Sequence, residues 1–154
     1  MKKIKYIRFS FPKKEEKIEN LSLKVSSTLD LLKIVNSNYF ENWFEQASSR
    51  KTALQKKIDE NINFIQAIIS KEWDKKFIEL GSNFSFWTGK SEDENFQISF
   101  IIGVTSQNKY IKNNICLSFP QDFNSQKELN ENCIKILCDG FEKIWKFQEI
   151  EIIR

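Results

Sequence analysis

The sequence predicts one α+β domain, residues 1–154, with two or three helices packed on one face of a mostly antiparallel sheet. Two stretches of the N-terminal half carry apolar residues at steps of three and four, which is the spacing of a helix laid on a sheet. After Gly81 the apolar spacing changes to two, which is the period of a strand. The chain has about the length of one domain and is 40% hydrophobic, so a core can form without a metal or a disulfide.

The first predicted element is a strand over residues 4–11, which Pro12 ends. The apolar alternation changes parity between Tyr6 and Ile7, and this predicts a β-bulge at that point. A helix follows from Ile18 with a continuous apolar stripe, and the polar residues 36–38 break it.

The middle of the chain begins with an aromatic cluster and a polar loop over residues 46–51. Asp59 is a suitable N-cap for a second helix, and helical spacing continues through Ile62, Ile65 and Ile69. We expect this helix to extend to Leu80, where the following glycine ends it.

Three consecutive strands are predicted over residues 84–87, 96–104 and 115–119. The connections between them, residues 90–95 and 105–112, are too short for helical crossovers. We therefore expect the three strands to form an antiparallel meander.

A last helix is predicted from Leu129 to Ile144. Gly140 within it either ends the helix or permits a close contact with a neighbouring element. The tail from residue 147 to residue 153 alternates weakly, which is compatible with an edge strand.

The composition excludes several common kinds of chemistry. Histidine is absent, so the commonest general base and a frequent zinc ligand are missing. The three cysteines, Cys116, Cys133 and Cys138, are too few for a four-ligand zinc site, and we interpret them as reduced thiols, with Cys133 as a small buried hydrophobe. No apolar run is long enough to cross a membrane. We expect a cytoplasmic protein with no membrane association, no cofactor, no metal and no catalytic residues.

Positive charge is concentrated at the N-terminus. Residues 1–17 contain seven cations and two anions, whereas the whole chain has a net charge of only +3. Arginine, which nucleic-acid readers favour for bases and phosphates, accounts for only three of the 24 cations. A nucleic-acid adaptor that uses the basic N-terminus is therefore an alternative that we do not favour.

Carboxylate-x-Lys fragments occur at Glu15-Glu16-Lys17 and Asp74-Lys75-Lys76. In metal-dependent hydrolases two carboxylates hold a metal ion and a lysine stabilises developing charge. Neither fragment lies on a predicted strand with a second acid before it, so we interpret both as solvated surface. A small metal-dependent hydrolase is the second alternative.

Acidic residues gather in the connection between the first two strands of the predicted meander, at Glu92, Asp93 and Glu94. One interpretation is a charged hairpin tip that prevents edge association. The other is a contact surface for a basic partner, because clustered carboxylates steer association with a cationic surface. We predict that Asp122 belongs to the same partner-binding surface.

A series of features follows in a defined order between Trp43 and Pro120. They are Trp43 and a polar loop leading to Ala53-Leu54, a helix, Leu80-Gly81 entering Phe84-Ser85-Phe86-Trp87-Thr88-Gly89, the strand through Gly103, and Ile115 to Pro120. This order, over about half of the chain, resembles the immunity protein 52 family of bacterial polymorphic toxin systems. Within it, Trp43, Trp87 and Gly89 are the positions closest to a family motif, and we expect them to be structural.

The resemblance implies an α+β immunity protein that binds and neutralises a cognate toxin encoded by a neighbouring gene. It further implies that such toxins are often nucleases of the restriction-endonuclease fold. The isoelectric point near 8.7 differs from that of inhibitors that mimic nucleic acid, which are strongly acidic. Any blockade of a nuclease is therefore expected to use local acidic patches or a site away from the substrate channel.

Overall fold

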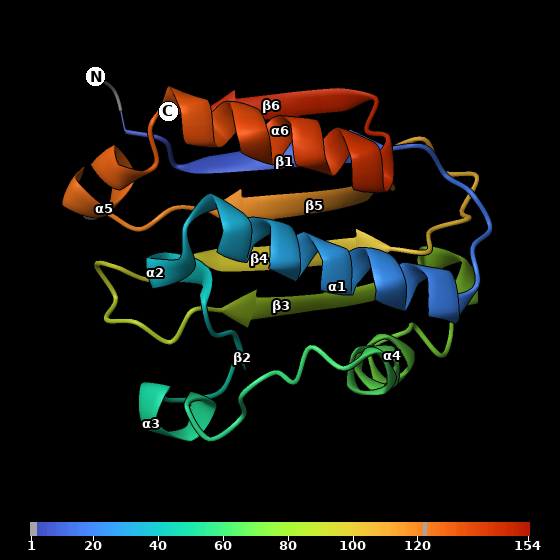
Figure 1. Cartoon of the computed structure of the whole chain (residues 1–154). Coiled ribbons are helices and arrows are strands. Elements are labelled where there is room, and N and C mark those ends of the chain that lie inside the picture. The colour runs from blue at the N-terminus through green and yellow to red at the C-terminus, as the bar shows by residue number, and fades with distance from the viewer. Residues whose placement is uncertain (1–2, 122) are drawn as a thin grey trace.

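The computed structural model describes residues 3–121 and 123–154, and the side chains of residues 123–125 lie outside this description. A six-stranded antiparallel sheet forms one layer, and helices α1 and α6 lie across one of its faces (Figure 1). The α+β class and the antiparallel sheet that the sequence predicts are confirmed.

The order of the strands in the sheet differs from their order in the chain. Strands β3, β4 and β5 are neighbours and pair antiparallel, while β1 lies between β5 and the C-terminal β6. Strand β6 is thus an edge strand, which confirms the interpretation of the weak alternation at residues 147–153. The strands are β1 (Tyr6–Phe11), β2 (Phe44–Glu45), β3 (Ser82–Trp87), β4 (Gln97–Ile102), β5 (Asn113–Ser118) and β6 (Glu149–Ile153).

Helix α1 (Ile18–Val35) is the central helix and packs against both α4 and α6 (Figure 1). Asn36 ends α1 and caps the next short helix, because its Oδ1 accepts a hydrogen bond from Tyr39 N at 3.1 Å. The remaining helices are α2 (Ser37–Phe40), α3 (Arg50–Ala53), α4 (Ile62–Lys71), the 3₁₀ turn η1 (Ile78–Leu80), α5 (Phe123–Glu128) and α6 (Glu131–Trp145).

The core lies between the sheet and these helices. Alternate strand residues such as Ile7 and Phe9 are fully buried, and they meet the buried stripe of α1. The Phe9 ring stacks on Phe141 of α6, with centroids 4.1 Å apart. Gly140 lies within α6 and does not end it, so the second of the two predicted alternatives holds: it permits close packing, because a Cβ there would lie 2.5 Å from the Leu31 side chain.

The predicted β-bulge at Tyr6–Ile7 is wrong. Strand β1 pairs with β5 without interruption from Tyr6, opposite Ser118, to Phe11, opposite Asn113. The misleading residue is Ile4, which precedes the strand and donates its backbone N–H to Gln126 Oε1 at 2.9 Å. Tyr6 itself faces away from the helices.

The second predicted helix is too long at both ends. Asn61 caps α4 through Asn63 N, while the Asp59 carboxylate accepts the backbone N–H of Asn61. Helix α4 ends at Lys71, and beyond it Asp74 Oδ1 accepts two backbone N–H groups in a tight turn. This side chain competes with helical hydrogen bonding, so only the short η1 follows.

Candidate functional site

The acidic residues Glu92, Asp93 and Glu94 are all exposed in the middle of the β3–β4 connection. We call these three residues the acidic tip. A turn holds the tip together, since Glu94 N donates to Ser91 O at 2.9 Å. Asp122, the fourth residue predicted for a partner surface, lies outside the described residues.

The base of the acidic tip is fixed by hydrogen bonds to buried groups. Asn95 Oδ1 accepts from the backbone N–H of Thr88 at 3.1 Å and from its hydroxyl at 3.2 Å. The Thr88 hydroxyl oxygen accepts from Phe96 N at 3.1 Å, and Thr88 and Phe96 are both buried. The tip is therefore presented on an ordered stem, which lowers the entropy lost when a partner binds.

The Trp87-Thr88-Gly89 motif lies at the end of β3 and contacts β2 and the segment that carries α3. Gly89 has a φ of +71°, and a Cβ there would lie 2.8 Å from atoms of Phe44 and Leu54. Arg50 Nε donates to Gly89 O at 3.2 Å, and Trp87 pairs with Phe44 of β2. These contacts give Trp87 and Gly89 a structural role next to the acidic tip.

Trp43 lies between the aromatic core and a cavity. Its side chain is only 1% exposed and stacks on Phe40, with centroids 5.7 Å apart. Its carbonyl accepts from Ile58 N at 2.8 Å, which holds the segment before α4 beside it. Its Nε1 is buried and has no hydrogen-bond partner among the described residues.

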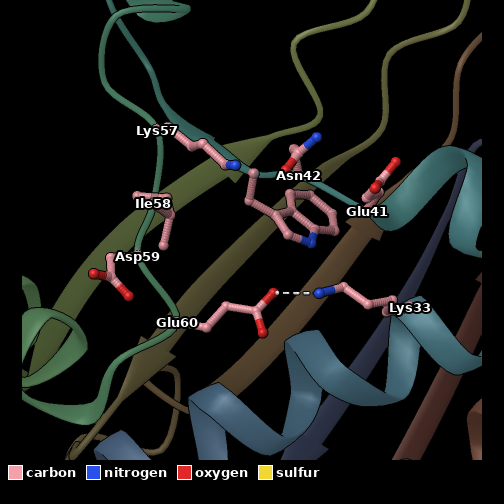
Figure 2. Close-up of a pocket in the computed structure, with 8 residues that line it drawn as sticks. Lys33, Glu41, Asn42, Lys57, Ile58, Asp59 and Glu60 are labelled. Carbon is pink, nitrogen blue, oxygen red and sulfur yellow. Dashed lines mark ion pairs between the residues drawn. The ribbon is translucent and has the colours of Figure 1, made fainter.

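A cavity of about 410 Å³ opens where α1, the α2–β2 connection and the segment before α4 meet (Figure 2). Lys33 reaches it from α1, and its Nζ lies 3.3 Å from Glu60 Oε1, the ion pair drawn in Figure 2. We call this cavity the Trp43 pocket; it is lined by Lys33, Glu41, Asn42, Trp43, Lys57, Ile58, Asp59 and Glu60.

Negative charge predominates in the Trp43 pocket, because three of its lining residues are carboxylic acids and two are lysines. Burial raises the pKa of Glu60, and the neighbouring Asp30 carboxyl raises it further through a hydrogen bond that favours the protonated form of Glu60, whereas Lys33 lowers it. The folded protein therefore disfavours the charged form of Glu60.

Sequence reasoning missed this pocket. Its residues come from three separate stretches, residues 33, 41–43 and 57–60, and no local motif links them. The one available signal was Trp43, which the sequence placed among structural motif positions.

The carboxylate side chains of the two carboxylate-x-Lys fragments make hydrogen bonds and an ion pair within the protein. Asp74 accepts the backbone N–H groups of Lys76 and Phe77, and Glu16 Oε1 lies 2.6 Å from Lys24 Nζ. Within residues 3–121 and 123–154, no group of three or more His, Cys, Asp or Glu side chains is arranged to hold a metal ion.

The three cysteines are free thiols, as predicted. Cys133 is half-buried at the edge of the core, so the expectation of a buried residue is wrong. Burial raises the pKa of the Cys116 and Cys138 thiols, which keeps them protonated at neutral pH.

No protein-family model matches this chain, and no curated protein matches it. Among the helices of the described part of the chain, none has the length and apolar character needed to cross a membrane. The resemblance to the immunity protein 52 family stays a prediction that rests on the residues quoted for it.

Proposed function

We propose that this protein is an immunity protein that binds and neutralises a cognate bacterial toxin. The resemblance over residues 43–120 implies this function, and it names nucleases of the restriction-endonuclease fold as the toxin class. The observation that carries the proposal is the acidic tip, which stands exposed on a hydrogen-bonded stem.

The acidic tip suits the recognition of a basic protein surface. Its three adjacent carboxylates are followed by Asn95, whose side chain is hydrogen-bonded to Thr88. A rigid patch of one charge sign raises the rate of association with an oppositely charged protein and loses little conformational entropy on binding.

The overall charge shapes the proposed mode of inhibition. With an isoelectric point near 8.7, the whole molecule does not imitate the charge of a nucleic acid. Inhibition is therefore proposed to act through a local contact of the acidic tip with the toxin, either at the rim of its active site or at a distance from it. In this proposal the protein is not an enzyme.

The contacts of the basic N-terminus do not favour a nucleic-acid adaptor. Lys13 Nζ donates to the carbonyls of Ser106 and Asn108 at 2.7 and 2.6 Å, and Lys3 Nζ donates to Gln121 O at 2.7 Å. These two cations stabilise the ends of loops, so they are not positioned as a free phosphate-binding row.

Co-expression with the toxin encoded next to this gene tests the proposal. The wild-type protein should restore growth and co-elute with the toxin on size-exclusion chromatography. A variant with Glu92, Asp93 and Glu94 replaced by lysine should protect less well. Failure of the wild-type protein both to rescue growth and to bind refutes the immunity function.

A charge-matched control separates the tip from net charge. Replacing the exposed residues Glu128, Asp139 and Glu142 by lysine changes the net charge of the molecule by the same amount at another site. This control should protect as the wild type does. Equal protection by both triple variants would show that the acidic tip is not the contact surface.

A further inference from the structure

The indole of Trp43 is a buried hydrogen-bond donor that lacks an acceptor. Trp73 Nε1 donates to Ile78 O and Trp145 Nε1 donates to Thr28 Oγ1, each at 2.8 Å. Trp43 Nε1 and Trp87 Nε1 are buried as well, but no acceptor among the described residues reaches either of them, and of these two tryptophans Trp43 is the one in the pocket lining. Buried donors in native proteins are almost always paired, and this residue lines an open pocket.

The charges around the same pocket favour the binding of a cation. Lys33 already pairs with Glu60, and the Asp30 carboxyl lies against Glu60 as well. Glu41 and Asp59 add two further carboxylates to the lining and Lys57 adds one further cation, so the acidic residues still outnumber the lysines. Figure 2 shows Glu60 opposite Lys33, with Asp59 on one side of the pocket and Glu41 on the other. A positively charged ligand would relieve the excess negative charge.

We propose that the Trp43 pocket binds a lysine or arginine side chain of the partner protein together with a neighbouring peptide carbonyl of that partner. The cation faces Glu60 and Asp59, while the carbonyl oxygen accepts the hydrogen bond from Trp43 Nε1. A volume of about 410 Å³ lies within the range of about 300–1,000 Å³ that ligand pockets occupy. A basic peptide segment carries both features in one chain.

The pocket lies close to the acidic tip. Phe96, at the base of the tip, packs edge-on against Phe40 of α2 with centroids 4.8 Å apart, and residues 41–43 follow directly. In Figure 1 the β3–β4 connection and α2 occupy the same end of the molecule. One basic partner can therefore contact both sites. The choice of the toxin as that partner rests on the proposed function, whereas the chemistry of the pocket does not.

Indole N–H resonances of the ¹⁵N-labelled protein give a direct test. The chain has four tryptophans, and the Trp43 signal is assigned by its loss in Trp43→Phe. If that variant does not fold, contacts from the Phe40 ring assign the signal in the wild type. The probe is Nα-acetyl-arginine methylamide, which carries a guanidinium group and two peptide carbonyls. The neutral comparison is the corresponding citrulline derivative.

The arginine probe should shift the Trp43 indole signal in a saturable manner. The citrulline derivative should bind the wild type at least about tenfold more weakly, and Glu60→Gln should weaken the arginine probe by a similar factor, because each change removes one charge of the pair. Glu142→Gln, an exposed change on α6, is the control and should bind the arginine probe as the wild type does.

Two results would overturn the assignment of the pocket. One is a Trp43 signal that does not move at any soluble concentration of the arginine probe, and the other is equal binding of the charged and neutral probes. Growth rescue without any probe binding would overturn the pocket proposal alone. Saturable probe binding without rescue would overturn the immunity function alone.

Discussion

Replacing Thr28 by valine should destabilise the fold because it leaves one buried hydrogen-bond donor without an acceptor. Thr28 is fully buried on α1, and its hydroxyl oxygen accepts from Trp145 Nε1 at 2.8 Å. Valine nearly preserves the shape of threonine but offers no acceptor. An indole N–H left unpaired in the core costs about 1–3 kcal/mol of the free energy of unfolding. Lys24 O, which also accepts from the Thr28 hydroxyl, keeps its acceptor role in the helix.

Urea unfolding followed by tryptophan fluorescence measures this loss. For a chain of this length, about 1 kcal/mol corresponds to a fall of about 2–4 °C in the melting temperature. A double-mutant cycle isolates the cause, because Trp145→Phe removes the donor itself. In that background Thr28→Val should cost much less.

Two outcomes would contradict the reasoning. One is a Thr28→Val variant as stable as the wild type, which would mean that the stranded indole finds water. The other is an equal loss in the wild-type and Trp145→Phe backgrounds, which would place the effect in packing rather than in the hydrogen bond.

Three further predictions concern the turn, the acidic tip and the pocket. Gly81→Ala should lower stability by about 2–5 kcal/mol in a thermal melt, because φ is +72° and the new Cβ would meet the Ile102 carbonyl; unchanged stability would contradict this geometry. Lysine at residues 92–94 should slow association with the toxin in stopped-flow mixing and change stability by less than about 0.5 kcal/mol. Burial and Asp30 raise the pKa of Glu60, so the folded state disfavours its charged form, and stability falls as the pH rises from the ordinary value of 4.5 through the raised pKa of the folded state. Glu60→Gln should flatten that fall in urea titrations at several pH values, and an unaltered pH profile would argue against it.

The sequence alone predicts individual parts of the candidate site but not how those parts come together. The acidic tip is three consecutive residues in a short connection between two alternating segments, so its exposure follows from local pattern. The positive φ of Gly89 also follows from a glycine at the end of a strand. The Trp43 pocket has no such pattern, because Lys33 and Glu60 become neighbours only when α1 meets the segment before α4.

The two errors in the fold have different origins, one a contact between distant residues and the other a set of local side-chain hydrogen bonds. The bulge prediction treated Ile4 as part of β1, but a hydrogen bond to Gln126, which is 122 residues away, holds Ile4 outside the strand. The second helix is shorter than predicted because the side-chain hydrogen bonds of Asp74 turn the backbone.

The sequence by itself determined the α+β class, the long helix over residues 18–35 and the strands after Gly81, because the spacing of apolar side chains is a local property that each element expresses alone. Only the tertiary structure decided that β1 lies between β5 and β6, and that Trp43 shares a pocket with Lys33 and Glu60. These arrangements depend on which distant segments bury their apolar faces against one another, and no single segment records that choice.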